Sequence, residues 1–158
     1  MEGYTEALEA EMQGIGGDTF LRSDENGIEH VCFLIPVNDD GDDVFVEMSV
    51  FGMNEYFLCL QVYCTVAHGF GGNLPGLEKA VGLWNGSSFG AYVIHYPGQS
   101  LHYRHLNILS ADSSPQETAR MAFYSLALAR EEINARLPEI LEFISVEDGP
   151  GAPGDIDR

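Results

Sequence analysis

The chain has 158 residues, of which 45% are hydrophobic and 11% aromatic, so it is long enough and apolar enough to fold as one domain. Its 25 Asp and Glu residues outnumber 7 Lys and Arg residues, which gives a formal net charge of −18 and a pI near 4.3. A surface of this sign repels nucleic-acid phosphates and anionic lipid headgroups, so we expect neither nucleic-acid nor membrane binding. The charge either keeps the protein soluble or steers it towards a basic protein.

The first residues and the cysteines predict a cytoplasmic protein. Residues 1–6 are acidic and lack the basic start and apolar core of a signal peptide. No uninterrupted apolar run approaches the ~18 residues of a membrane-spanning helix. The three cysteines (Cys32, Cys59 and Cys64) form an odd set within strand-like runs, where a reduced thiol acts as a small hydrophobic group. We therefore expect no disulfide framework.

The first part of the chain predicts a helix followed by an antiparallel meander. Residues 4–13 place Ala7, Leu8 and Met12 at helical spacing and end at a glycine-rich stretch. A short extended piece follows at residues 19–22. Runs rich in Val, Ile, Phe and Tyr, separated by turn residues, then predict three strands. These strands are expected at residues 28–37, 43–51 and 56–68.

A second helix and a hairpin are predicted next. Beyond a glycine-rich link at residues 69–72, four apolar residues recur at helical spacing: Leu77, Ala80, Val81 and Trp84. Two further strands follow, joined by a turn at residues 97–100. These strands are expected at residues 89–96 and 101–110.

The start of the last helix is the best-marked boundary in the sequence. Ser114 as N-cap, Pro115 at the first helical position and Glu117 three residues after the cap form a capping box. A stripe of apolar residues then runs over residues 119–144 and would cover one face of a sheet. Pro138 cannot donate a backbone hydrogen bond, so we expect the helix to kink or break there.

Two motifs of catalytic proteins fit a structural role better than a chemical one. Residues 86–90 match the G-x-S-x-G pattern of serine hydrolases, but they lead from a helix into a strand, the reverse of the order that the nucleophile needs. No His follows Asp112 to complete the usual order of the triad. The glycine-rich link at residues 69–72 has Leu74 where a dinucleotide-binding loop has its third glycine. We interpret both segments as connections and expect no catalytic residue.

Metal binding is also not expected, although two patterns come close to it. The acidic residues 38–43 resemble a calcium loop, but Ser49 stands where the bidentate Glu belongs. His95 and His102 flank the predicted hairpin turn symmetrically, so pairing would place them opposite each other, ~5 Å apart at Cβ. His30 or a carboxylate would be needed to complete a site, since two ligands are too few.

The order of the elements resembles the YbjN-like family and the related type III secretion chaperones, over roughly residues 4–146. The sharpest local likeness is the helix at residues 77–85 leading into the strand at residues 89–96, similar to the helix that ends in Asn before the second sheet segment of YbjN-like proteins. The resemblance implies a protein that is not an enzyme and needs no cofactor. Secretion chaperones of this fold are dimers that hold unfolded client segments, whereas YbjN-like proteins have regulatory roles.

We therefore expect one α+β domain at residues 1–146 and a disordered acidic tail at residues 147–158, because the tail is rich in Gly, Pro and Asp. The domain should hold a twisted antiparallel sheet packed against the N- and C-terminal helices, in the order α-β-β-β-α-β-β-α. The expected function is that of a chaperone-like or regulatory protein-binding module. The alternative is an acidic inhibitor or immunity-type protein that binds a basic surface.

The second helix is the expected contact of a homodimer. Leu83 lies about 100° from Trp84 around the helix, so both side chains can be buried only if two directions are covered. A symmetric partner is the simplest cover for the second direction. The expected contact residues are Leu77, Val81, Leu83 and Trp84.

Overall fold

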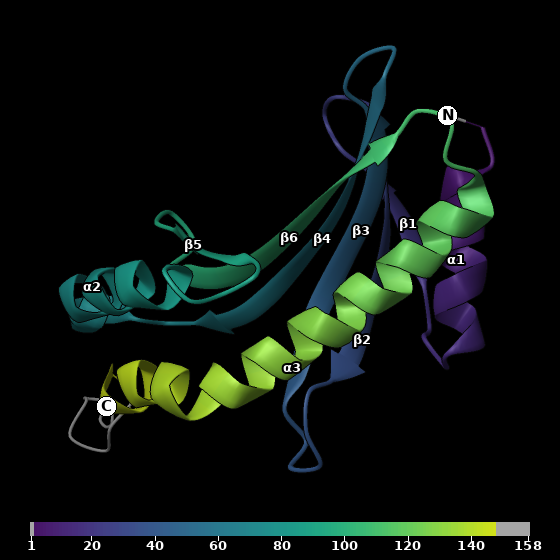
Figure 1. The fold of residues 1–158 in the computed structure, drawn as a ribbon. Helices are drawn as coiled ribbons and strands as arrows, with labels where there is room; N and C mark the ends of the chain where they lie inside the picture. Colours follow the sequence, from purple (N-terminus) through teal and green to yellow (C-terminus); the bar gives the residue numbers. More distant parts are fainter. Residues whose placement is uncertain (1, 148–158) are drawn as a thin grey trace.

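The helices and strands follow the predicted order, with one extra strand (Figure 1). The computed structural model describes residues 2–147, and residues 148–158 of the expected tail lie outside them. The helices are α1 (Tyr4–Gly14), the 3₁₀ turn η1 (Gly71–Asn73), α2 (Leu74–Asn85) and α3 (Pro115–Glu147). The strands are β1 (Phe20–Ser23), β2 (Glu29–Pro36), β3 (Asp43–Gly52), β4 (Phe57–His68), β5 (Ala91–His95) and β6 (Ser100–Ser110). The α+β class is confirmed, and the short extended piece forms β1.

The six strands form one antiparallel sheet in the order β1-β2-β3-β4-β6-β5. β2, β3 and β4 make the predicted meander, and α2 then carries the chain to the β5–β6 hairpin. β6 pairs with β4, so β5 becomes one edge of the sheet and β1 the other. The hairpin turn lies one residue earlier than predicted: the Gln99 N–H donates to the Tyr96 carbonyl at 3.1 Å, and Ser100 already belongs to β6.

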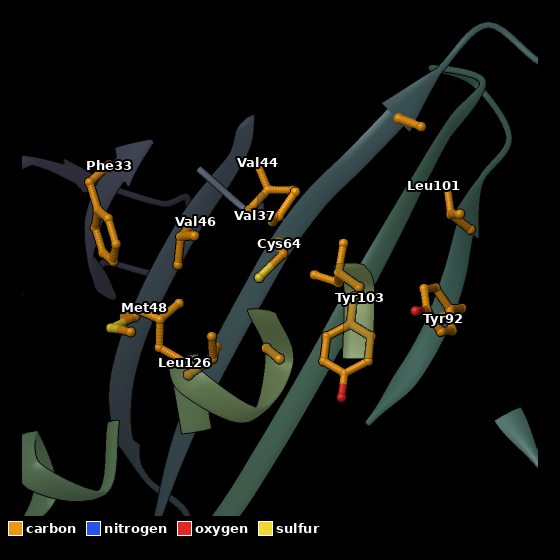
Figure 2. Packing of buried hydrophobic residues seen from close by; sticks show 14 of the residues in the cluster. Phe33, Val37, Val44, Val46, Met48, Cys64, Tyr92, Leu101, Tyr103 and Leu126 are labelled. Atoms are coloured by element: carbon orange, nitrogen blue, oxygen red, sulfur yellow. The ribbon is translucent and has the colours of Figure 1, made fainter. Parts of the chain in front are cut away.

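All three helices bury their apolar residues against the same face of the sheet. This face carries alternate positions of the strands, as the period of two requires. Figure 2 shows Val46, Met48 and Cys64 projecting from neighbouring strands on the side where Leu126 of α3 lies. The helices add Leu8 and Met12 from α1, Leu77, Val81 and Trp84 from α2, and Ile133, Leu137 and Ile140 from α3. A single core therefore joins the helices to one sheet face.

The capping box predicted at the start of α3 is confirmed. The Ser114 Oγ accepts a hydrogen bond from the Glu117 N–H at 3.1 Å, and the Glu117 Oε1 accepts one from the Ser114 N–H at 2.8 Å. The bond from the Ser114 N–H also lowers the pKa of Glu117 below its ordinary value. Two backbone donors of the first turn thus have side-chain partners.

Ser114→Ala should lower the free energy of unfolding by about 1 kcal/mol, because the Glu117 N–H loses its acceptor. Ser113→Ala is the matched control, since only the backbone of Ser113 makes hydrogen bonds in this turn among the described residues. Urea denaturation followed by circular dichroism measures both variants. A midpoint for Ser114→Ala equal to that of the wild type would show that the cap contributes nothing.

Of the kink or break expected at Pro138, the break is wrong, because α3 continues through this residue to Glu147. Pro138 faces solvent, whereas Leu137 and Ile140 beside it are buried in the core. A proline inside a helix costs ~3 kcal/mol, and burying a large aliphatic side chain recovers about 1.5–3 kcal/mol each time. Core packing on both sides of Pro138 therefore outweighs its local preference.

Candidate binding surface

Within residues 2–147, no helix packs on one of the two faces of the sheet, because α1, α2 and α3 all pack into the core on the other side. We call this surface the open face. Its strand positions, taken from the pairing register, alternate with those of the core. They are Phe20, Arg22, His30, Cys32, Leu34, Pro36, Asp43, Phe45, Glu47, Ser49, Phe51, Phe57, Cys59, Gln61, Tyr63, Thr65, His68, Ala91, Val93, His95, Ser100, His102, Arg104, Leu106, Ile108 and Ser110.

The open face is apolar and poor in charge. Leu34 is 61% exposed and Ile108 54% exposed, and Phe20 and Leu106 are also exposed. Its strand positions hold four charged side chains, Arg22, Asp43, Glu47 and Arg104. These four charges cancel, so the whole of the −18 net charge lies elsewhere on the chain. Depletion of charge together with exposed aliphatic and aromatic groups is typical of the centre of a protein–protein interface.

Charged groups occur at the centre of this face in one row across the strands. Glu47 of β3, Tyr63 of β4 and Arg104 of β6 are consecutive partners in the register. Arg22 of β1 donates to one carboxylate oxygen of Glu47, and this bond raises the pKa of Arg22. No ion pair of Arg104 is found among the described residues. Arg104 therefore presents an unpaired cation on a mostly neutral surface.

The edge of the sheet at β5 is less available than the open face. The Asn85 side chain, at the end of α2, accepts a hydrogen bond from the Tyr92 N–H at 2.6 Å and donates to the Tyr92 carbonyl at 3.0 Å. These are the groups that an added strand would use on the outer side of β5. The side-chain amide of Asn85 thus occupies the hydrogen-bonding groups of Tyr92 at this edge. The open face is the larger exposed apolar surface.

The imidazoles do not form the arrangement expected from the sequence. His95 pairs with Ser100 and His102 with Val93, so the two histidines are diagonal neighbours, not opposite each other. Their ring centroids lie 6.1 Å apart. His30 lies away from them and contacts Asp24 at 2.9 Å. Residues 2–147 contain no group of three or more His, Cys, Asp or Glu side chains placed to hold a metal ion.

His102 is instead built into the open face. Its Nδ1 lies 3.2 Å from the Thr65 Oγ1 and its Nε2 lies 2.8 Å from the Ser100 Oγ. Its ring stacks on Tyr63 at a centroid distance of 4.8 Å. Burial lowers the pKa of His102 below 6.5, and the neighbouring charges of His95 and His68 lower it further. The neutral imidazole is the form that fits this environment.

The free energy of unfolding should fall as the pH drops from about 7 to about 5, because the unfolded chain accepts a proton on His102 before the folded chain does. A group with a depressed folded pKa stabilises the fold above its unfolded pKa and loses this contribution as the pH falls through its folded pKa. His102→Gln should flatten this part of the profile, with the remainder due to His105, whose pKa burial also lowers. Urea denaturation at several pH values measures the slope, and an equal slope in wild type and His102→Gln would contradict the assignment.

The four predicted dimer contacts on α2 are not on one surface. Leu77, Val81 and Trp84 are buried in the chain's own core, whereas Leu83 is 71% exposed. The C-terminal half of α3 covers the Trp84 side of α2: Trp84 packs edge-to-face on Phe143, and its indole N–H donates to Glu139 at 3.3 Å. A contact through α2 therefore has Leu83 alone to offer from this set.

The serine of the G-x-S-x-G pattern has a structural role in the connection from α2 to β5. The Ser88 hydroxyl donates to the Trp84 carbonyl at 2.8 Å, and the Ser87 hydroxyl donates to the same carbonyl at 3.3 Å. Both bonds satisfy a carbonyl of the last turn of α2. This agrees with the interpretation of the segment as a helix-to-strand connection.

One shallow groove lies on the helical side of the molecule, with a volume of about 300 Å³. It is lined by Ile15, Ile35, Pro36, Phe123, Leu126, Ala127 and Arg130. The guanidinium group of Arg130 in this groove is already hydrogen-bonded, because its Nε donates to the Pro36 carbonyl at 2.8 Å. The groove thus lacks the converging polar groups that orient a small substrate.

No family model matches the chain, and no curated protein matches it. Within residues 2–147, none of the helices is both long and apolar enough to cross a bilayer. The open face is therefore the feature from which a function can be inferred.

Proposed function

We propose that the chain is a non-catalytic protein-binding module of chaperone-like or regulatory type, and that the open face is its contact surface. The observation that carries this proposal is the concentration of exposed apolar side chains on a sheet face that holds four of the charged residues of a −18 chain. Covering apolar surface stabilises a complex by about 25 cal/mol per Å² before the costs of association. The charges elsewhere keep the free protein in solution.

The chaperone-like or regulatory character is proposed from the order of the elements. The helix, meander, helix, hairpin and long helix resemble the YbjN-like proteins and the type III secretion chaperones. Such proteins work in the cytoplasm without a cofactor, and we propose the same for this chain. The partner is a protein, and the apolar open face fits an apolar surface on it.

The alternative proposal is an acidic inhibitor or immunity-type protein. The observation that favours it is the acidic β2–β3 loop, where Asp39, Asp40 and Asp42 line one side of a depression against α3. Such a loop would bind a basic surface by charge, and its complex would weaken steeply as salt is added. A complex through the open face depends on apolar burial and would persist in salt.

Native mass spectrometry of the protein purified from its own cells tests the proposed surface. We expect a species above 17.3 kDa for the wild type that is lost in Ile108→Asp and retained in Tyr124→Asp. Tyr124 is a matched control because it lies on α3 and is 57% exposed, close to the 54% of Ile108. A wild type of 17.3 kDa, or a complex that survives Ile108→Asp, would overturn the proposal.

A further inference from the structure

The central row of the open face has opposite charges at equal distances from β4. Glu47 and Arg104 flank Tyr63 in the register, one strand to each side. Neighbouring strands are ~4.8 Å apart, so the two charged residues are related by a reflection across β4. A surface with this pattern is complementary to a copy of itself that has been turned over.

A two-fold axis along β4 produces that copy. Rotation about this axis stacks two open faces and exchanges the two sides of each sheet, so β3 of one molecule lies over β6 of the other. Glu47 of each copy then faces Arg104 of the other copy. The contact is isologous and closes after two subunits.

The same rotation brings apolar side chains together in two other rows of the open face. Phe51 and Ile108 are both register partners of Cys59, on opposite sides of β4, so each would lie over the other residue in the second copy. Leu34 of β2 and Val93 of β5 lie two strands from β4 in the row of His102, and they would face each other in the same way. Opposite charges therefore meet in the central row and apolar side chains meet at these two pairs, whereas Phe45 lies over His102 and Ser49 over Leu106.

We infer that the open face is the interface of a symmetric homodimer, in which two sheets stack about an axis along β4 and Glu47 of each copy pairs with Arg104 of the other. This inference rests on the proposed function and names its partner. It moves the dimer contact from α2, whose Leu77, Val81 and Trp84 are buried within the chain, to the sheet.

The geometry of stacked sheets accommodates these pairs. Face-to-face sheets lie ~10 Å apart, a gap that an Arg and a Glu side chain can span together. Arg22 hydrogen-bonds to one carboxylate oxygen of Glu47, which leaves the other oxygen for Arg104 of the second copy. A partner with a uniformly basic surface would instead bury Arg104 against like charge. A second copy supplies the counter-charge that Arg104 lacks among residues 2–147 of its own chain.

Exchange of the two charges gives a test with an internal rescue. Arg104→Glu leaves two carboxylates in the central row of each face, and Glu47→Arg leaves two guanidinium groups in that row, so each variant alone should dimerise at least about 100-fold more weakly. An equimolar mixture of the two variants should dimerise again, because both cross-pairs are then of opposite sign. Arg120→Glu on α3 is the control, since it changes the net charge as Arg104→Glu does at an exposed position away from the sheet.

Light scattering over a concentration series, with circular dichroism to confirm folding, measures these species. We expect twice 17.3 kDa for the wild type, for Arg120→Glu and for the mixture, and 17.3 kDa for each charge variant alone. Glu47→Gln is a second variant that places no cation beside Arg22, and it should also weaken the dimer. A wild type of 17.3 kDa at every concentration, dimers of both charge variants alone, or a mixture that stays monomeric would overturn the inference. A complex of another mass that Ile108→Asp abolishes would overturn the dimer and support the proposed function.

Discussion

Gly90→Ala should lower the free energy of unfolding by roughly 3 kcal/mol, because there is no space for a methyl group at this position. A Cβ on Gly90 would lie 2.5 Å from the Tyr103 Cζ and 2.7 Å from the Arg104 carbonyl oxygen. Contacts below 3.0 Å require one of the groups to move. The backbone of β6 cannot move without breaking its pairing with β4.

Tyr103 cannot move aside either. Its ring is fully buried and packs edge-to-face on Tyr92 at a centroid distance of 5.1 Å. Its hydroxyl donates to Glu132 of α3 and accepts from the Gly90 N–H at 3.1 Å. The Glu132 carboxylate also accepts from the Phe89 N–H at 3.1 Å. This cluster attaches the start of β5 to α3, so a displaced Tyr103 would leave buried polar groups without partners.

Gly82→Ala is the matched control for Gly90→Ala. Gly82 lies inside α2, and an added Cβ meets nothing within 4 Å. Alanine there should stabilise the protein by up to about 1 kcal/mol, because glycine is the poorer helix former. Chemical denaturation of both variants gives the comparison. Two variants of equal stability would show that the contacts around Gly90 are not as close as described.

Trp84→Ala should cost about 3–5 kcal/mol, while Leu83→Ala should change stability by less than about 0.5 kcal/mol. Trp84 is 4% exposed and packs edge-to-face on Tyr92 and Phe143. The Arg136 guanidinium also lies 5.5 Å from the centre of its ring. Truncation would leave a cavity between α2, β5 and the end of α3.

Thermal and urea denaturation of the two adjacent variants measure this difference. Tryptophan fluorescence cannot follow Trp84→Ala, since the chain has one Trp, so circular dichroism is the common signal. Similar, small losses for both variants would mean that Trp84 is not in the core and that α2 is free to act as a dimer contact.

The sequence predicts the elements well where the determining interactions are local. The capping box at Ser114 is one example, because its two hydrogen bonds join residues three apart. The register of the β5–β6 hairpin is also set locally, but it lies one residue away from the position predicted from the sequence. Gln99 adopts a φ of 48°, and the turn that it helps to form moves the pairing so that His95 meets Ser100. The equal spacing of His95 and His102 on either side of residues 97–100 does not show that the turn begins one residue earlier.

Contacts between distant segments explain the other differences. Pro138 remains helical because Leu137 and Ile140 are buried in the core. Trp84 is covered by Phe143, 59 residues later, whereas Leu83 on the other side of α2 stays exposed. Neither contact leaves a periodic signal in the local sequence.

The open face could not be located from the sequence, although its strands carry a signal. Residues 32–35 read Cys-Phe-Leu-Ile, which is apolar on both sides of the strand. Such a run predicts a strand buried on both faces but does not say which face the helices cover. With α1, α2 and α3 all on one side, none of the described helices covers the second apolar face.

Photo-cross-linking in the protein's own cells tests the central claim, that the open face contacts protein, most directly. A benzophenone amino acid placed at Ile108 should form covalent adducts with protein, whereas the same group at Leu83, the exposed residue of α2, should form none. Both native side chains are exposed, at 54% and 71%, so reagent access does not distinguish them. Adducts at Leu83 together with none at Ile108 would contradict the account and return the contact to α2.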